Sequence, residues 1–254
     1  EEPVVWDSVS GKIVQATANY GTRKQFLGPV MYSILANVMA QPKAKFPMLF
    51  QAAINSIQGK HALMYFSDPK IQGAVESFNL AGRMSESEED YLAIVDTNFS
   101  GGKTNIWVKY KADQKIEVAG DGTVTKTLTL TYDNPQEGRV KIESGRSLNG
   151  LFRDWVRVYV PKGSELIEAK GFETGQATSE DLGKTVFEGF FTLAPLNTKV
   201  ISLKYKLPFK LKSPYSLVIQ KQAGAKDFPY TTTINNRKQP EIILSADQSL
   251  KLAY

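Results

Sequence analysis

The 254-residue chain contains no cysteine. Disulfide bonds, thiolate metal sites and a cysteine nucleophile are therefore excluded. Histidine is nearly absent too: His61 is the only one, whereas a catalytic zinc site of the usual kind needs several. No apolar run reaches the ~18 residues that a membrane-spanning helix requires. The composition therefore argues against a disulfide-stabilised protein, a histidine-based metalloenzyme or a membrane span within this chain.

The charge balance is slightly basic. Lys and Arg number 31 against 26 Asp and Glu, which gives a formal net charge of +5 and a pI near 9.1. Such a surplus favours anionic partners through long-range attraction that salt screens. The alternative is that the charge only keeps the protein soluble. No nucleic-acid-binding module is recognisable, so we expect no nucleic-acid partner.

Helical patterns dominate the first hundred residues. Apolar residues at helical spacing predict four helices, and the apolar run His61–Phe66 predicts a strand between the third and the fourth. Asp68-Pro69 predicts the start of the fourth helix, and Ser85–Asp90 is typical of a solvated acidic loop. Gly28-Pro29 predicts that the second helix is kinked there or begins only after it. The predicted helices span Val4–Asn19, Arg23–Met39, Phe46 or Pro47 to Ile57, and Pro69–Leu80.

From Tyr91 onward the pattern changes to short strands, and Asp121-Gly122 predicts a hairpin turn. We therefore expect an α+β protein, in which a helical and mixed part (residues 1–100) packs on a C-terminal antiparallel β-sandwich (residues 101–254). The predicted strands are Tyr91–Val95, Asn105–Tyr110, Lys115–Ala119, Val124–Tyr132, Phe152–Val160, Glu165–Glu173, Thr185–Leu193, Lys199–Leu207, Tyr215–Gln222, Tyr230–Asn235 and Glu241–Ser245.

An ordered set of short motifs resembles a bacterial family known only as domain of unknown function 4012. Its core resembles Asp96-Thr97-Asn98 followed by Gly101-Gly102-Lys103-Thr104, and the likeness runs from about Thr22 to Ile234. The resemblance implies a large extracytoplasmic region behind an N-terminal membrane helix, with no known activity. It also implies an upstream region, so this chain is expected to be the C-terminal portion of a longer protein, attached to the membrane only through a segment absent from it. Further motifs in the same order are Arg23-Lys24-Gln25-Phe26-Leu27, Lys60-His61, Tyr65-Phe66, Gly120-Asp121-Gly122, Arg157–Gly163, Gly183–Phe187, Tyr205–Pro208 and Gln220–Gly224.

Signals for catalysis are weak. Ser100–Thr104 resembles the end of a phosphate-binding loop, but the first glycine of that motif is replaced by Thr97 and a strand pattern follows where a helix should. Asp68 and Asp96 each follow a short apolar run, and with Lys103 they are the candidates for acid–base chemistry on a glycan. The alternatives are that Asp68 caps a helix and Asp96 bonds within a loop. We expect no cofactor and no metal site.

The segment Lys199–Lys212 is the strongest candidate for a binding surface. Lys204 and Lys206 share one strand face, Lys210 continues it, and Tyr205 brings an aromatic ring close by. Asn98 and Lys103 in the loop before residue 105 are further candidate binding residues. The alternative is an edge strand that lysines protect from aggregation.

Two functions are therefore open. The first is a non-catalytic extracytoplasmic module of the bacterial cell envelope that binds or scaffolds an anionic polymer or a protein partner. The second is an envelope enzyme acting on glycans or polymer transfer, which requires Asp68, Asp96 and Lys103 to converge in one cleft.

Overall fold

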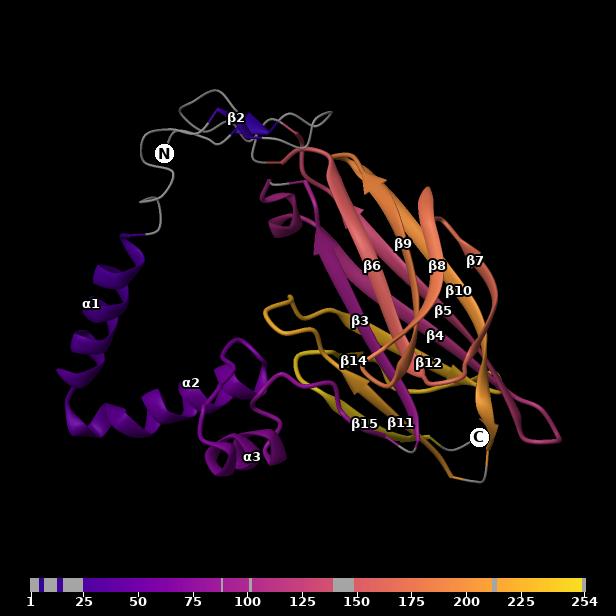
Figure 1. Cartoon of the computed structure of the whole chain (residues 1–254), viewed down its shortest axis with the longest axis horizontal. Helices are drawn as coiled ribbons and strands as arrows, with labels where there is room; N and C mark the ends of the chain where they lie inside the picture. Colours follow the sequence, from indigo (N-terminus) through magenta and orange to yellow (C-terminus); the bar gives the residue numbers. More distant parts are fainter. Residues whose placement is uncertain are drawn as a thin grey trace. The chain divides into compact units, whose positions relative to one another are not determined.

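The computed structural model describes residues 5–6, 13–15, 25–87, 89–100, 102–138, 149–211 and 214–252 (Figure 1). The chain divides into two compact units, Glu1–Asn55 and Ser56–Tyr254. This division differs from the one expected at residue 100, because the predicted strand Tyr91–Val95 belongs to the second unit, inside one of its sheets. The described residues are mostly β-strand with three α-helices, which confirms the α+β class.

The first described residues form strands rather than a helix. β1 (Val5–Trp6) pairs antiparallel with β2 (Ile13–Gln15), so the helix predicted over Val4–Asn19 is wrong at the residues described. Valine, isoleucine and tryptophan favour strands, and helical spacing alone did not outweigh that preference. The other residues of the range lie outside the described part of the chain.

The two helices predicted next are confirmed. α1 (Leu27–Met39) and α2 (Phe46–Gln58) are joined through a short 3₁₀ helix, η1 (Lys43–Lys45). Pro29 lies in the first turn of α1, where a missing N–H removes no intrahelical hydrogen bond, so the helix begins before it. Within the described residues, no helix combines the length and hydropathy needed to cross a membrane.

α3 (Pro69–Ser77) belongs to the second unit and precedes the strands of its two sheets in the sequence. It begins where predicted, because Oδ1 of Asp68 accepts hydrogen bonds from the backbone N–H groups of Lys70 (2.8 Å) and Ile71 (3.1 Å). The strand predicted at His61–Phe66 is wrong: the segment is irregular and mostly exposed, and Met64 makes a single backbone bond to Leu80. An apolar run without a neighbouring strand does not define a strand.

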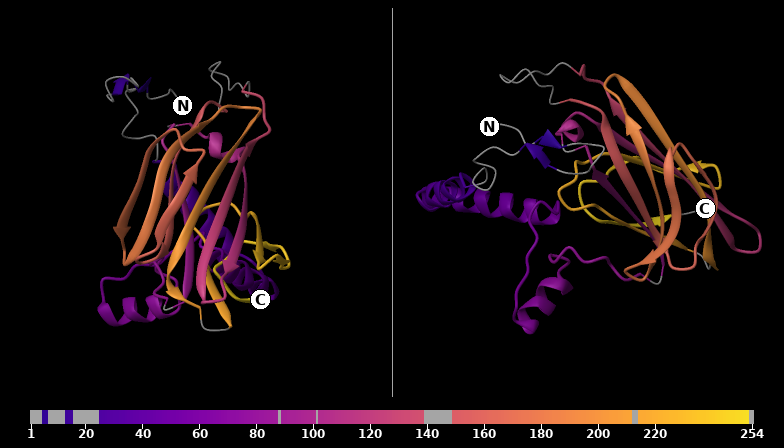
Figure 2. Two further views of the ribbon diagram at one scale, coloured as in Figure 1. Left: turned by 90° about the vertical axis from the view of Figure 1, so that its right-hand side faces the viewer. Right: turned by 45° about the horizontal axis from the view of Figure 1, so that its top comes forward.

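Six strands form the first sheet, in the order β15-β11-β3-β6-β9-β8 (Figures 1 and 2). β3 and β11 run parallel and the other pairs are antiparallel. The bounds are β3 (Asp90–Asn98), β6 (Phe152–Pro161), β8 (Thr174–Asp181), β9 (Lys184–Leu193), β11 (Tyr215–Gln220) and β15 (Gln248–Leu252).

Seven strands form the second sheet, in the order β13-β12-β4-β5-β10-β7, with β14 also paired to β12. β4 and β12 run parallel, so each sheet is mixed and the expectation of purely antiparallel pairing is wrong. Strands far apart in sequence can join in parallel because the intervening chain carries the long connection. The bounds are β4 (Lys109–Val118), β5 (Thr123–Asn134), β7 (Glu165–Lys170), β10 (Asn197–Lys210), β12 (Pro229–Ile234), β13 (Arg237–Lys238) and β14 (Ile242–Ile243).

Some strand limits differ from the prediction. The hairpin at Asp121-Gly122 joins β4 and β5 as expected, with Gly122 at φ +86°. The strand predicted from Asn105 starts only at Lys109, because a 3₁₀ helix, η2 (Thr104–Ile106), precedes it. β8, β13 and β15 were not predicted; β8 has mostly exposed residues and therefore lacks the apolar alternation that marks a half-buried strand.

The two sheets share one hydrophobic core. Every second residue of a strand contributes to it, as on β5, where Leu128, Leu130 and Tyr132 are buried between half-buried threonines. Aromatic rings meet across the sheets: the centroids of Tyr132 and Phe191 are 4.7 Å apart.

The shared core also encloses a charged cluster. Asp90 accepts hydrogen bonds from Nζ of Lys126 and the hydroxyl of Tyr215, and all three side chains are buried. Burial lowers the pKa of Lys126, and the charge of Asp90 opposes that shift. Asp90 was predicted within an exposed loop, Ser85–Asp90. For this residue the prediction is wrong, because it starts β3 on the face that points into the core.

Candidate functional site

An acidic pocket of about 310 Å³ opens between β3, β6 and the loop that follows β11. Two carboxyl groups, Asp96 and Asp154, lie in its wall. Amide and aromatic side chains make up much of the rest, and Lys226 is its one lysine among the described residues. The principal polar and aromatic lining residues are Asp96, Asn98, Asn105, Tyr110, Phe152, Asp154, Gln222, Lys226 and Phe228.

The strand period places both carboxyl groups on the inner face. On β3, Asp96 follows the core residues Leu92 and Ile94 at intervals of two, and on β6 Asp154 lies between Phe152 and Val156. The antiparallel register pairs residue 154 with residue 98 and residue 156 with residue 96. The two carboxyl groups are therefore diagonal neighbours on one face of the sheet.

Asp96 is held from two sides. Its Oδ1 accepts a 2.7 Å hydrogen bond from the hydroxyl of Tyr132 on β5, in the opposite sheet. The side chain of Gln222 clamps its backbone, since Oε1 accepts from the Asp96 N–H (3.0 Å) and Nε2 donates to the Asp96 carbonyl (2.9 Å). The loop after β11 is thereby fixed to the C-terminal part of β3.

Asp154 has no such donor. Its side chain is fully buried, and neither carboxyl oxygen is reached in regular hydrogen-bond geometry by a donor among the described residues. The polar groups beside it are the Asp96 carboxyl and the backbone of Thr97. Burial, followed by the charge of Asp96, raises the pKa of Asp154 to about 10. Burial also raises the pKa of Asp96, against the lowering effect of the Tyr132 bond. The pair therefore shares a proton at neutral pH.

Aromatic rings line the side of the pocket formed by the second sheet. The ring centroid of Tyr110 is 5.4 Å from that of Tyr132 and 6.5 Å from that of Phe228. Asn98, predicted as a binding residue, lies in the pocket wall and also organises the adjoining loop: Nδ2 donates to the Gly102 carbonyl and to Asn105 Oδ1, both at 3.3 Å. Rings and planar polar groups thus face the same space.

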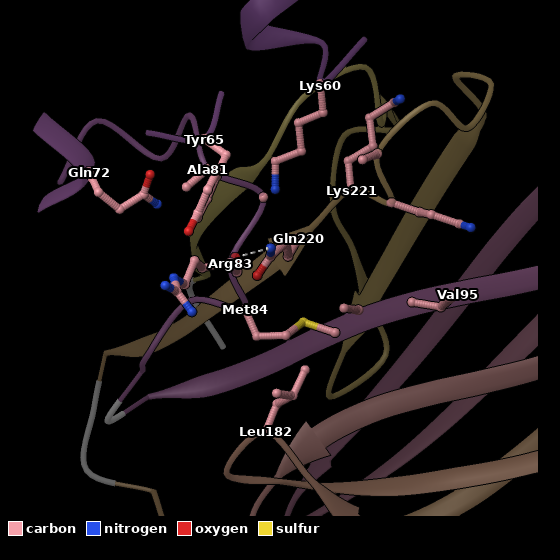
Figure 3. A pocket seen from close by; sticks show the side chains of 14 residues that line it. Lys60, Tyr65, Gln72, Ala81, Arg83, Met84, Val95, Leu182, Gln220 and Lys221 are labelled. Carbon is pink, nitrogen blue, oxygen red and sulfur yellow. Dashed lines mark hydrogen bonds between the residues drawn. The ribbon is translucent and has the colours of Figure 1, made fainter. Parts of the chain in front are cut away.

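A second hollow, of about 510 Å³, lies on the opposite face of β3 (Figure 3). Lys60 points into it, with Met84 and Leu182 on the far side. Its three cationic side chains already have partners. Lys60 is 2.7 Å from Asp247, Arg83 is 2.7 Å from Glu76, and Lys221 donates to the carbonyl of Gly59 at 3.2 Å. Because these charges are already satisfied, this hollow is a weaker candidate for a binding site than the acidic pocket.

The residues predicted for catalysis do not meet in one pocket. Asp96 lines the acidic pocket, but Asp68 is exposed and caps α3, and Lys103 is exposed and outside the pocket wall. The prediction missed Asp154. A signal for it was present, because an aspartate alternates with Phe152 and Val156 on the inward parity of a strongly apolar strand.

The predicted lysine surface is correct in its geometry but not in every residue. Lys204 and Lys206 lie on the face of β10 opposite the buried residues, and Nζ of Lys210 is 2.8 Å from Asp121. Tyr205 is fully buried in the core, so its predicted binding role is wrong. The edge-strand alternative is also wrong, because β10 pairs with β5 on one side and β7 on the other. Lys212 lies outside the described residues.

No group of three or more His, Cys, Asp or Glu side chains suited to holding a metal ion occurs in the part of the chain that the structure describes. Asp96 and Asp154 are the two carboxyl groups that line the acidic pocket.

Comparisons with known proteins add little to this geometry. No family model matches the chain, and no curated protein matches it. Among solved structures, a candidate nutrient-binding protein from Legionella pneumophila is similar over 58% of this chain and 54% of its own, at 9% identity and a TM-score of 0.36. An M1 zinc metallopeptidase from Deinococcus radiodurans is similar over 50% of this chain and 31% of its own, at 12% identity and a TM-score of 0.26. This chain thus spans about half and about a third of these two proteins, and similarity at this level supports no argument about function.

Proposed function

We propose that the chain is a non-catalytic extracytoplasmic module of a membrane-anchored bacterial envelope protein, and that it binds a hydroxyl-rich envelope polymer in the acidic pocket. The motifs that resemble the domain of unknown function 4012 family support the location. We also infer that the two sheets form a β-sandwich. The proposal on binding depends on the pocket itself.

The observation that carries the proposal is that the buried Asp154 carboxyl has no hydrogen-bond donor among the described residues. A buried acceptor without a donor is unfavourable by about 1–3 kcal/mol, and this one borders an open pocket. Sugar hydroxyl groups would supply the missing donors. The amide nitrogen of Asn105 can donate to a further hydroxyl group, and the faces of Tyr110 and Phe228 can cover the apolar side of a sugar ring. A volume of about 310 Å³ fits one small unit of a polymer rather than a long segment.

The spacing of the carboxyl groups favours binding over cleavage. Glycoside hydrolysis uses two carboxyl groups separated by roughly 5–10 Å, with the sugar bond between them. Here the Asp96 and Asp154 carboxyl groups lie directly beside each other as diagonal neighbours on adjacent strands, which leaves no space for a glycosidic bond between them. The alternative function, an enzyme acting on glycans, would require the pair to separate when substrate binds. Release of reducing sugar from a bound polymer would support that alternative.

The lysines of β10 fit an additional role toward anionic groups of the same polymer. Lys206 is 47% exposed and lies 3.9 Å from Glu165, and Lys210 is 67% exposed. Exposed charges of this kind add long-range attraction, while the pocket supplies the specific contacts. An anionic polymer or a protein partner thus remains part of the proposal.

Filling the pocket tests the function. Ile106 lines the pocket and is 54% exposed, so Ile106→Trp should occupy the entrance without disturbing the core. Ile167 on β7 is 56% exposed and lies outside the pocket wall, which makes Ile167→Trp a matched control. Affinity for purified envelope polysaccharides would be measured by isothermal titration with the whole chain.

We expect Ile106→Trp to weaken binding at least tenfold and Ile167→Trp to leave it unchanged. Equal affinity of both variants would place binding elsewhere on the molecule. Failure of the unmodified chain to bind any polysaccharide would overturn the proposal.

A further inference from the structure

We propose that the acidic pocket selects a sugar unit carrying a protonated amino group, so that the polymer recognised is one with free amines rather than N-acetylated ones. The inference rests on the proposed function, because it concerns the same pocket and names the group that enters it.

The carboxyl pair itself points to a cation, because two acidic groups are adjacent and no cation pairs with either among the described residues. Two carboxyl groups lie side by side, and among the described residues neither forms an ion pair with a lysine, an arginine or the histidine. Lys226 lines the same pocket, but its Nζ donates to the backbone carbonyl of Ile106. Neither carboxyl group therefore has a cationic side chain of the described residues in contact with it. A positive group in the pocket could pair with the two carboxyl groups without having to displace a lysine from either.

The form of the lining favours an organic ammonium over a metal ion. Calcium takes six to eight oxygen ligands, whereas only two carboxyl groups converge here. The side-chain oxygens of Asn98 and Asn105 already accept hydrogen bonds, from Ser100 and from Asn98 respectively. Aromatic rings line the remaining wall, and ring faces attract organic cations.

An ammonium group also matches the hydrogen-bond needs of the pair. It has up to three N–H donors, and Asp154 has two carboxyl oxygens that no donor among the described residues reaches in regular geometry. A hydrogen bond from a charged ammonium donor to a carboxyl oxygen is stronger than one from a neutral hydroxyl. An N-acetyl group has one weaker donor and adds a methyl and a carbonyl oxygen, and that carbonyl would face the carboxyl pair without a hydrogen bond.

Matched oligosaccharides test the inference on the intact chain. A glucosamine trisaccharide and its N-acetylated counterpart would be titrated at pH 6 into the unmodified chain and into Asp96→Asn/Asp154→Asn, whose folding circular dichroism would confirm. Ile106→Lys, which sets a cation at the pocket wall, and Ile106→Met, which does not, provide a second pair at an exposed position.

We expect the unmodified chain to prefer the amine form at least tenfold and the double variant to lose that preference. Ile106→Lys should weaken binding of the amine form more than Ile106→Met does. Equal affinity for the two trisaccharides would overturn the inference and leave the proposed function standing, as would a preference that persists in the double variant. Absence of binding to either trisaccharide and to every polysaccharide would overturn both.

Discussion

Two aspartates of the same strand have opposite surroundings. Asp90 and Asp96 both lie on the inner face of β3, six positions apart. Asp90 has a lysine and a tyrosine hydroxyl as donors and is sealed in the core. Asp96 has one tyrosine hydroxyl, a second carboxyl group in place of a lysine, and an open pocket beside it.

The difference shows which polar cluster belongs to the scaffold. Around Asp90, the opposite charges are paired and hydrogen-bonded to each other. The cluster therefore holds the two sheets together and leaves no hydrogen-bonding group for a ligand. At the Asp96 end, no donor in the described part of the chain reaches the buried Asp154 carboxyl, and two acidic groups are adjacent. An arrangement of this kind is unfavourable for folding and is typical of functional sites.

Disrupting the buried cluster of Asp90, Lys126 and Tyr215 should have the largest effect on stability. Lys126→Met leaves Asp90 buried without its cation and should lower the free energy of unfolding by about 3–5 kcal/mol in urea denaturation. Asp90→Leu/Lys126→Met removes both charges and should be clearly less destabilised than the single variant. Equal loss in both would mean that packing, rather than the ion pair, dominates at this end.

Asp154→Asn, in the acidic pocket, should reduce the loss of stability at alkaline pH. The pKa of Asp154 rises from 3.8 in the unfolded chain to about 10 in the folded protein, so the folded state binds the extra proton. Its contribution to stability is complete below pH 4 and is lost as pH rises toward 10. Asparagine stays uncharged, so unfolding measured at pH 5 and pH 9 should show a smaller alkaline loss in the variant, by at least ~1.4 kcal/mol, the equivalent of one pKa unit.

The control for that experiment is Glu165→Gln, which alters a carboxylate that is 73% exposed. Its pH dependence should match that of the unmodified chain. Tyr110 and Tyr132 face the same pair from β4 and β5 and Lys226 faces the pocket, and the pKa values of both tyrosines are raised by burial. An alkaline loss that persists fully in Asp154→Asn would assign the proton to one of these groups.

Tyr132→Phe should produce a smaller change. It removes the donor to Asp96 Oδ1, so the free energy of unfolding should fall by about 1 kcal/mol. The pKa of Asp96 should rise further, because that hydrogen bond stabilises the ionised form. Carbon-13 NMR of the aspartate carboxyl groups would measure the shift; an unchanged pKa would show that the hydroxyl does not stabilise the carboxylate.

Reversing the charge of the lysines on the solvent-facing side of β10 should change stability least. Lys204→Glu/Lys206→Glu/Lys210→Glu should alter the free energy of unfolding by less than about 1 kcal/mol, since exposed ion pairs contribute little. Binding of a polyanion should weaken, most strongly at low salt. Salt-independent binding in the variant would remove these lysines from the proposed surface.

The sequence predicted several elements well because their signals are local. Asp68-Pro69 marks the start of α3 through a cap that needs only the next three residues. Alternation along Val124–Tyr132 predicts β5, because a strand with one face in the core needs that period. The helix over Val4–Asn19 and the strand at His61–Phe66 were wrong, because a few apolar residues fit either period until a partner is known.

The sequence predicted only one of the two aspartates of the acidic pocket. Asp96 was singled out by its place after an apolar run, whereas Asp154 lies 58 positions later and becomes its neighbour only through the register of β3 and β6. Tyr205 was predicted to be available for binding, yet the first sheet covers it, with the Phe187 ring 5.3 Å from its own.

By itself, the sequence determined that the chain is α+β, lacks disulfides and presents lysines on one face of β10, because each of these follows from composition or from the repeat of a single strand. The tertiary structure decided which aspartate meets a lysine and which meets another aspartate. That choice depends on strand order and on the packing of two sheets, which bring together residues far apart in the chain and set the dielectric and the donors around each carboxyl group.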